Sequence, residues 1–337
     1  MPTFRLGKIP GIEHIVSDNE SVQSEPCPGE ITVRVLATSL NQHDYNVVMG
    51  RLPSEPGRVL LSDACCIVES VGDGVTQFQA GDRVISCFFP SWNSGRQKVP
   101  GFSTVPGDGV DGFACSFVTK PASHFVHAPS NLDAFGCATL TTAALTAWRA
   151  LVVENQVKPG DSVLTLGTGG VSIFAVQFSR MLGATVIGTS SADSKLEKLR
   201  ALGVGECVNY SQDENWGQRV RALSGGVGVD HVVEVGGQGT LAQSIEASRV
   251  GGSIALIGVL TGIGGYVPLA AMMGKQIRLQ GITVASRQDL ENMVKAIEAN
   301  QLQPVIDTVF PLSDLQGAFR HMESGQHFGK IVIDHTK

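Results

Sequence analysis

The spacing of hydrophobic and polar residues in this chain changes near residue 135. Before that point the hydrophobic residues come in short alternating runs, as in GEITVRVLATSL, where Ile31, Val33 and Val35 alternate with polar neighbours. Such alternation is typical of a half-buried β-strand. The segments ACCIVESVGDGV and GDRVISCFF predict further short strands, joined by Gly-Asp turns. Residues 1–125 are therefore predicted to form a β-rich domain.

After residue 135 the pattern becomes an alternation of helices and strands. A helix is predicted over Thr139–Val153, and the apolar runs SVLTL, TVIGTS, ECVNY, DHVVEV and SIALIGVL then alternate with amphipathic stretches. This order is typical of a parallel, doubly wound sheet with helices on both faces. The apolar strand near the C-terminus is expected to return to the first domain. The prediction is an α/β chain with one domain from residues 1–125 and 301–337 and another from residues 126–300.

A long irregular loop is predicted over residues 91–112, which hold many glycines and prolines. Loops of this length in compact domains are often functional. The aromatic residues Phe88, Phe89, Trp92 and Phe102 lie in or beside this loop. They either wall a pocket for an apolar or aromatic substrate or only pin the loop to the core.

The segment SVLTLGTGGVS combines a strand, a glycine-rich turn and the start of a helix. Gly167 permits a tight turn, while Gly169 and Gly170 leave room for a phosphate beside the helix amides. Ser172 stands where the usual spacing has a third glycine, and it is small enough for close packing. The unit predicts a dinucleotide-binding site; the alternative is an ordinary strand-to-helix turn.

The position that selects between two nicotinamide cofactors follows about twenty residues later. There the chain has Ser190 and Ser191 where an acid would bind an adenosine ribose. Serine hydroxyls can donate to a 2′-phosphate and Lys195 can add charge, so NADPH is the predicted cofactor and NADH the less favoured one. The alternative is that the serines only cap the following helix, although a helix start is itself an anion site.

Two further glycine loops follow predicted strands, at Gly236–Gly237 and at residues 258–260. In open α/β sheets, ligands bind outside the carboxyl ends of the strands. These loops therefore either line the cofactor or are simple turns.

Composition and charge narrow the class of partner. The 337 residues carry a net charge of −6 and no run of Lys or Arg, which argues against nucleic acid or an anionic membrane. The N-terminus MPTFRLGKIPG lacks the apolar core of a signal peptide, and no apolar run is long enough to span a bilayer. Seven cysteines without a CxxC pair favour a reducing cytoplasm. A small-molecule substrate is the expected partner.

Together these motifs resemble the medium-chain dehydrogenase/reductase superfamily, which contains zinc alcohol dehydrogenases and quinone oxidoreductases. The resemblance covers essentially the whole chain. It implies a GroES-like catalytic domain, a Rossmann cofactor domain and an active cleft between them. It also implies a homodimer paired through QIRLQGITV, with that segment near the nicotinamide and Lys330 at the pyrophosphate. The matching segments are VESVGDGV at 68–75, GDRV at 81–84, TAWRAL at 146–151, LGTGGVS at 166–172, GVDHVVEVGG at 228–237 and GKIVI at 329–333.

The chain departs from the zinc enzymes of that superfamily at the metal. Those enzymes hold catalytic zinc with a Cys, a His followed by Glu, and a second Cys or an acid. At the corresponding positions this chain has Asn41, Ser62 with Asp63, and Thr142. Asn, Ser and Thr are not usual zinc ligands, and the lobe with four closely spaced cysteines is missing. We predict no zinc; the chain is most similar to the zinc-free branch of quinone oxidoreductases and enoyl reductases. Asp63 either orders the cleft or caps a local turn.

The segment NQHDY supplies the candidate catalytic groups. Asn41 and Asp44 match the N-x-x-D pattern that the zinc-free branch carries at the nicotinamide end. His43 falls near the proton-relay Ser or Thr of the zinc enzymes and can donate a proton near neutral pH. Tyr45 can donate to an enolate oxygen. The alternatives are a structural histidine at a strand end and a tyrosine ring that forms a pocket wall.

Reaction chemistry without a metal favours a conjugated acceptor. Carbonyl reduction must stabilise an alkoxide, which zinc does as a Lewis acid. Hydride addition to an enone, enal or quinone instead spreads charge into an enolate or over two oxygens, so modest hydrogen bonding suffices. The alternatives are a zinc-free alcohol dehydrogenase or carbonyl reductase, a non-enzymatic NADPH-binding protein, and an enzyme for carrier-bound acyl substrates. The candidate cofactor-binding residues are Thr142, Gly167, Thr168, Gly169, Gly170, Val171, Ser190, Ser191, Lys195, Tyr210, Gly236, Gly258, Val259, Leu260 and Lys330.

Overall fold

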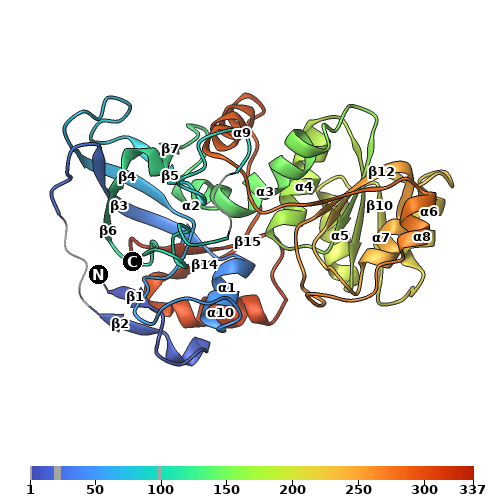
Figure 1. Cartoon of the computed structure of the whole chain (residues 1–337), viewed down its shortest axis with the longest axis horizontal. Coiled ribbons are helices and arrows are strands. Elements are labelled where there is room, and N and C mark those ends of the chain that lie inside the picture. Colours follow the sequence, from blue (N-terminus) through green and yellow to red (C-terminus); the bar gives the residue numbers. More distant parts are fainter. Residues whose placement is uncertain (1, 19–23, 98–100) are drawn as a thin grey trace. The chain divides into compact units, whose positions relative to one another are not determined.

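The chain folds into two compact units (Figure 1). The computed structural model describes residues 2–18, 24–97 and 101–337. Unit 1 comprises Met1–Leu145 and Val284–Lys337, and unit 2 comprises Thr146–Thr283. Unit 1 is therefore built from both ends of the chain, with unit 2 inserted in the sequence between them.

Unit 1 is β-rich, as the alternating pattern predicts. In its described part the main sheet has the order β14-β15-β3-β4-β5-β7, with β6 also paired to β3, while β1 and β2 form a separate pair. The side chains of Ile31, Val33 and Val35 are buried. Strand β15 pairs antiparallel with β3, which confirms that the C-terminal strand returns to the first domain. The strands are β1 (Thr3–Arg5), β2 (Val16–Asp18), β3 (Glu30–Ser39), β4 (Cys65–Val71), β5 (Arg83–Ser86), β6 (Phe117–Pro121), β7 (Phe125–His127), β14 (Ile306–Pro311) and β15 (Lys330–Asp334).

The helices around this sheet are mostly short. The predicted helix over residues 139–153 exists, but its winding alternates between α and π turns across the boundary of the two units. The helical elements of unit 1 are η1 (Ile12–His14), α1 (Gln42–Val48), η2 (Ala122–His124), α2 (Ala134–Ala138), η3 (Leu140–Ala144), α9 (Arg287–Ala299), η5 (Leu312–Asp314) and α10 (Leu315–Glu323). Helix α3 (Leu145–Trp148) crosses the boundary between the units, and η4 (Arg149–Glu154) belongs to unit 2.

The division between the units differs from the predicted one. Residues 126–145 and 284–300, expected in the cofactor domain, belong to unit 1. Helix α2 packs on β3 and β4, and α9 contacts β7. The backbone N–H of Arg287, at the start of α9, donates to the carbonyl of Trp92 in unit 1. Tertiary packing, which the local pattern does not reveal, therefore sets the boundary.

Unit 2 is a doubly wound sheet of six parallel strands in the order β10-β9-β8-β11-β12-β13. This confirms the Rossmann architecture. Because the strands are parallel, their carboxyl ends share one edge of the sheet, and β13 is the outermost strand on one side. The elements are β8 (Ser162–Leu166), α4 (Gly170–Met181), β9 (Thr185–Ser190), α5 (Asp193–Ala201), β10 (Glu206–Asn209), α6 (Trp216–Leu223), β11 (Val229–Glu234), α7 (Leu241–Ala247), β12 (Ser248–Leu256), α8 (Leu269–Gly274) and β13 (Arg278–Gly281).

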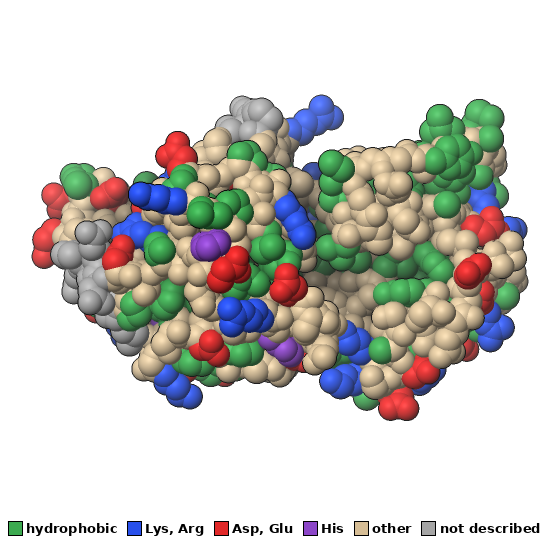
Figure 2. Space-filling model, turned by 90° about the horizontal axis from the view of Figure 1, so that it is seen from below, with side chains coloured by type: hydrophobic (Ala, Val, Ile, Leu, Met, Phe, Trp, Pro, Cys, Tyr) green, Lys and Arg blue, Asp and Glu red, His purple; other side chains and the backbone are tan. Residues whose placement is uncertain are grey.

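The distribution of charged side chains on the surface agrees with the sequence, in which acidic and basic residues are mixed. Figure 2 shows acidic and basic side chains interspersed on the face that it displays. Among the described residues, no helix combines the length and the apolar character needed to cross a membrane.

Candidate functional site

The glycine-rich turn after β8 has the geometry of an anion site. Gly167 adopts a left-handed backbone conformation, with φ of +71°. Gly169 is the N-cap of α4 and provides no side-chain hydrogen bond to the helix. A Cβ added at Gly167 or Gly169 would meet nothing within 4 Å. The turn thus opens onto free space with uncapped helix amides beside it, which fits a dinucleotide phosphate.

Ser172 explains how the turn tolerates the loss of the third glycine. Its side chain is buried, and Oγ donates to the carbonyl of Leu166 at 2.6 Å. The hydroxyl therefore ties the first turn of α4 to the end of β8. The close helix–strand packing that a glycine usually allows is kept by a small residue with an internal hydrogen bond.

The carboxyl end of β9 carries the serines that were predicted to select the cofactor. Ser190 is buried, and its Oγ accepts a hydrogen bond from the backbone N–H of Ala192 at 3.3 Å. The N-cap of α5 is Ala192, which lacks a side-chain cap, so neither serine occupies the capping position. Ser191 is exposed and Lys195 is half-buried.

A carboxylate also lies at this end of the sheet. Asp193, in the first turn of α5, accepts hydrogen bonds from Asn209 Nδ2 at 2.7 Å and Gln212 Nε2 at 3.1 Å. Tyr210 follows β10 and is 42% exposed, and its backbone N–H donates a hydrogen bond to the carbonyl of Ser190. The amides of Asn209 and Gln212 thus hold the Asp193 carboxylate beside the serines.

Glu234 organises the next loop, and sequence reasoning did not identify it as a site residue. The residue is fully buried, and Oε1 accepts hydrogen bonds from the backbone N–H groups of Gly236 at 2.7 Å and Gly237 at 3.0 Å. The hydroxyl of Thr240 donates to the same oxygen, and the hydroxyl of Ser244 donates to Oε2. The available signal was an acid between apolar residues at the end of the run VVEV, because a buried carboxylate needs such donors.

Close backbone packing explains why glycine is required in the loops after β11 and β12. Gly237 has φ of +87°, and a Cβ there would lie 2.9 Å from Val259 Cα. A Cβ on Gly258 would lie 2.2 Å from the carbonyl oxygen of Val235. The two loops therefore pack backbone against backbone at the same sheet edge as the glycine-rich turn. A role of Gly236, Gly258, Val259 and Leu260 in cofactor binding stays a prediction.

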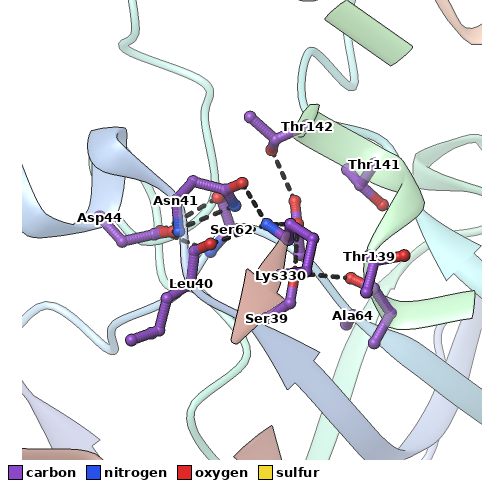
Figure 3. Close-up of polar contacts among 12 residues, drawn as sticks. Ser39, Leu40, Asn41, Asp44, Ser62, Ala64, Thr139, Thr141, Thr142 and Lys330 are labelled. Carbon is purple, nitrogen blue, oxygen red and sulfur yellow. Dashed lines mark hydrogen bonds and ion pairs between the residues drawn. The ribbon is translucent and has the colours of Figure 1, made fainter. Parts of the chain in front are cut away.

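Unit 1 contains a buried ammonium group at the start of β15 (Figure 3). The side chain of Lys330 is 2% exposed. Its Nζ donates to the carbonyl of Leu40 at 2.7 Å and to Asn41 Oδ1 at 2.6 Å, and it lies 3.6 Å from Asp63 Oδ2. Burial lowers the pKa of Lys330, while Asp63 and Asp44 oppose that shift. The pyrophosphate contact implied by the family resemblance stays a prediction.

Asp63 joins three separate segments of unit 1. Its carboxylate is fully buried and accepts hydrogen bonds from Ser39 Oγ at 2.8 Å and Thr142 Oγ1 at 2.5 Å. The preceding Leu61 has φ of +73°, which is a strained conformation for a bulky residue. The strained turn places Asp63 between β3, η3 and Lys330. Asp63 therefore has an ordering role rather than that of a local cap.

Asp44 has the contacts of a positioning residue for Asn41. Its Oδ2 accepts hydrogen bonds from the backbone N–H of Asn41 at 2.9 Å and from Asn41 Nδ2 at 3.2 Å. Its Oδ1 accepts from the backbone N–H and the hydroxyl of Ser62, both at 3.0 Å. Burial raises the pKa of Asp44, and Asp63 adds to the shift. The N-x-x-D pattern is thus a capping box at the start of α1.

The groups at the zinc-ligand positions do not fit a zinc ion. Asn41 directs its only side-chain oxygen at an ammonium group. The Ser62 hydroxyl donates to Asp44, and the Thr142 hydroxyl donates to Asp63. None of the three positions carries the thiolate or imidazole that zinc prefers. Lys330 supplies the positive charge in this cluster.

His43 extends from α1 toward the long loop. Its ring makes edge contacts with Phe88 and Phe102, at centroid distances of 5.2 and 4.8 Å. Nε2 lies 3.2 Å from Asp108 Oδ2, and both side chains are nearly buried, at 11% and 5% exposed. Asp108 lies in a Gly-Asp-Gly segment typical of a turn, so this contact could not be predicted from the local pattern.

The aromatic residues around the loop divide into two groups. Phe88, Phe89 and Trp92 are buried, which supports the interpretation that they pin the loop to the core. Phe102 is half-buried and stacks on Phe89 at a centroid distance of 6.2 Å. Phe102 is therefore the aromatic side chain of this group that retains exposed surface.

Tyr45 has a hydrogen-bond partner inside unit 1. Its hydroxyl donates to Glu323 Oε1 at 2.6 Å, and the guanidinium of Arg51 lies 5.2 Å from the ring centroid. Burial and the Glu323 carboxylate raise the pKa of Tyr45. Of the two candidate proton donors, Tyr45 thus already has an internal acceptor for its proton.

Comparisons with known proteins agree with this architecture. A family model described as "Alcohol dehydrogenase GroES-like domain" matches residues 27–130, and one described as "Zinc-binding dehydrogenase" matches residues 170–299. A zinc-type alcohol dehydrogenase-like protein of Schizosaccharomyces pombe is 38% identical over 97% of this chain and 96% of its own length. A 2-haloacrylate reductase of Burkholderia sp is 30% identical over 96% of each chain.

Solved structures show the same relationship. A structure from Sinorhizobium meliloti 1021, classed provisionally as an alcohol dehydrogenase, has a TM-score of 0.93 and 37% identity, and the match covers 99% of this chain and 98% of that one. The chain therefore belongs to the medium-chain dehydrogenase/reductase superfamily. It is an oxidoreductase that depends on a nicotinamide cofactor.

The solved relatives include both cofactor forms. An NAD-dependent alcohol dehydrogenase matches with a TM-score of 0.91 and 32% identity, over 99% of each chain. A mycobacterial protein complexed with NADPH matches with a TM-score of 0.83 and 26% identity, over 99% of this chain and 100% of that one. The choice between the two forms therefore depends on the residues of this chain.

Proposed function

We propose that the protein is a zinc-independent reductase that uses NADPH to reduce a carbon–carbon double bond conjugated to a carbonyl group, or a quinone. The observation that carries this proposal is the Lys330–Asn41 contact at 2.6 Å. The Lys330 ammonium group faces the side-chain oxygen of Asn41, which stands at a zinc-ligand position. The site therefore offers no zinc ion as a Lewis acid to stabilise an alkoxide. Conjugated acceptors have less need of one, because their negative charge is delocalised.

The residues of unit 2 support nicotinamide binding, with the glycine-rich turn on the phosphates and Ser190 and Ser191 near the adenosine ribose. Bound NADPH supplies a hydride. We assign the 2′-phosphate to Ser191, Lys195 and the uncapped start of α5, where hydroxyl, ammonium and amide donors can combine. Asp193 does not exclude this assignment, because two amide groups already bind its carboxylate.

His43 is the group to which we assign the proton. Hydride addition at the β-carbon breaks the carbon–carbon π bond and places the electron pair in an enolate. A proton from the His43 imidazolium then forms the second new C–H bond at the α-carbon, and solvent returns the proton to the ring. The product is the saturated carbonyl compound. The buried Asn41–Asp44 pair orders the start of α1, on which His43 lies.

One experiment separates conjugate reduction from its main alternative. Purified protein, NADPH and a simple enone are mixed, and the product is identified by mass and chromatography. A saturated ketone supports the proposal. An allylic alcohol would show carbonyl reduction instead, the reaction that the names of the alcohol dehydrogenase-like relatives suggest. The 2-haloacrylate reductase relative favours the first outcome, because a haloacrylate is a conjugated alkene.

The substrate that we propose is a small molecule with an apolar or aromatic part. The half-buried Phe102 and the edge of the His43 ring offer it an aromatic surface in unit 1. We also propose a reducing compartment such as the cytoplasm, because all seven cysteines are free thiols and five of them are buried.

A second copy of the chain is the macromolecular partner that we propose. Strand β13 is an outer strand of its sheet, and its outer backbone groups are available for pairing with another strand. The segment before it exposes Leu260, Ile263, Tyr266, Leu269 and Met273. A symmetric dimer would cover these side chains. Analytical ultracentrifugation tests this: Ile263→Lys should yield monomers, and a monomeric wild-type chain would contradict the proposal.

A further inference from the structure

Asp108 reaches His43 from a loop whose backbone is tightly fixed. Gly107, before it, has φ of +82°, and a Cβ there would lie 2.8 Å from the backbone nitrogen of Leu61. A Cβ on Gly109, after it, would lie 2.2 Å from the carbonyl of Ser103. The hydroxyl of Ser54 donates to the carbonyl of Asp108 at 2.9 Å. Both flanking positions thus require glycine, and the position of Asp108 is determined by packing.

The Asp108 carboxylate is 5% exposed and lies 3.2 Å from His43 Nε2. A buried carboxylate needs a donor, and an imidazole lone pair turned toward it would be repelled. Nε2 must therefore carry a hydrogen. In the structure Nε2 is buried and its contact with Asp108 lacks the alignment of a hydrogen bond. Such contacts in ligand-free sites often align only when substrate binds.

We propose that Asp108 is the positioning residue of His43, and that it holds a hydrogen on Nε2 so that Nδ1 delivers the proton to the reduced substrate. This inference rests on the proposed reductase function. In this step the imidazolium loses its Nδ1 proton to the substrate carbon and becomes the neutral Nε2–H form, and Asp108 exchanges no proton. An orienting carboxylate of this kind fixes the ring and its tautomer without contacting the substrate.

The surroundings of the ring agree with this assignment. Phe88 and Phe102 make edge contacts with the His43 ring and restrict its rotation. Within the part of the chain that the structure describes, two carboxylates interact with this ring: Asp108, which lies beside Nε2, and Asp44, which lies on the same helix. Asp44 is already bound by Asn41 and Ser62, which leaves Asp108 as the carboxylate available to the ring.

The first test observes the tautomer and needs no substrate. Histidine side chains are labelled with ¹⁵N, and the His43 signal is identified by its loss in His43→Ala. The wild-type protein should show a protonated Nε2 and an unprotonated Nδ1 in the neutral ring. Asp108→Asn should change that spectrum, because the amide can also donate to Nε2. An identical His43 spectrum in Asp108→Asn overturns the proposal.

The second test measures turnover. Asp108→Asn should lower kcat by about 10- to 100-fold, no more than the loss of the general acid itself, and leave the KM for NADPH unchanged. The double variant His43→Ala/Asp108→Asn should lose no more than His43→Ala alone, because Asp108 acts through the ring. Additive losses overturn the proposal. Asp111→Asn is the matched control, because Asp111 lies in the same loop but binds Val59 and Arg58.

The two tests distinguish this inference from the proposed function. If the tautomer is as expected and no enone or quinone is reduced, the reductase assignment fails while the Asp108–His43 pair stands. If the enone is reduced and Asp108→Asn keeps both the wild-type spectrum and the wild-type kcat, the reductase assignment stands and the role of Asp108 fails.

Discussion

Lys330 Nζ lies 2.6 Å from Asn41 Oδ1, so the last strand of the chain supplies a cation to the start of α1. The contact also determines how the amide of Asn41 is oriented. An ammonium can only donate, so the oxygen must face Lys330 and Nδ2 must face Asp44. The cation thereby orders a segment that carries His43.

Replacing this lysine should destabilise unit 1. Lys330→Met leaves the buried Asp63 without its cation, and breaking a buried ion pair in this way costs about 3–5 kcal/mol. Urea unfolding measures the loss. Lys337→Met is the matched control, because Lys337 is exposed and its pair with Asp334 should contribute less than about 1 kcal/mol. Equal losses in the two variants would contradict a structural role for the Lys330 ammonium.

Removing the imidazole should affect turnover rather than cofactor binding. We expect His43→Ala to lower kcat with an enone by about 100-fold, the lower range for general acid catalysis, with unchanged NADPH affinity. Steady-state kinetics and fluorescence titration measure the two quantities. His14→Ala replaces a histidine on the surface as a control. Wild-type turnover in His43→Ala would count against this donor, and a large loss in Tyr45→Phe would shift the assignment to Tyr45.

Adding a carboxylate at the end of β9 should change the cofactor preference. Ser190→Asp places a negative charge near the proposed 2′-phosphate, and a repulsion of about 1.4 kcal/mol weakens NADPH binding about tenfold. NADH binding should be retained. Isothermal titration with both cofactors measures the ratio of affinities. Ser194→Asp adds the same charge elsewhere in the first turn of α5, and an equal effect there would remove the argument from Ser190.

Metal removal should leave activity unchanged. The hydroxyl and amide groups at the zinc-ligand positions are already engaged with Lys330, Asp44 and Asp63. Prolonged dialysis against EDTA is therefore expected to leave the turnover and the thermal unfolding midpoint of the protein intact. Elemental analysis gives the zinc content directly. One zinc per chain that survives gel filtration would overturn the zinc-independent mechanism.

His335 should make the fold sensitive to mild acid. Its ring is buried between Thr38 and the carbonyl of Cys115, and burial lowers its pKa to about 4. In the unfolded chain a histidine has a pKa of about 6.5. Below that pH, His335 is therefore protonated in the unfolded chain but remains neutral in the folded chain. The free energy of unfolding therefore falls between about pH 6.5 and 4, by up to about 3 kcal/mol.

Unfolding measured across this pH range checks the assignment to His335. His335→Gln should make the slope of the profile smaller, since glutamine does not titrate, and His124 contributes what remains. His14→Gln, at the surface, should keep the wild-type slope. An unchanged slope in His335→Gln would assign the acid sensitivity to another group, such as His124, whose pKa burial also lowers to about 4.

The sequence predicted those features that depend on local pattern. The alternation in β3 and the strand–turn–helix unit at Gly167 are local, and both were correctly located. Asp108 and Glu323 were not predicted as partners of His43 and Tyr45, because only the fold brings these pairs together. The ends of unit 2 were misplaced for the same reason, since the contacts that place α9 in unit 1 are made with β7 and Trp92.

The place of β15 in the middle of the unit 1 sheet has a consequence for biosynthesis. This strand lies between β14 and β3 and is translated after the whole of unit 2. Residues 146–283 can emerge from the ribosome and fold while β3, which pairs with β4 and β6, still lacks its third partner β15. Domains usually fold in the order of their synthesis. Here the unit that begins first finishes last, so a nascent chain leaves the end of β3 near Ser39 unpaired until β15 has been made.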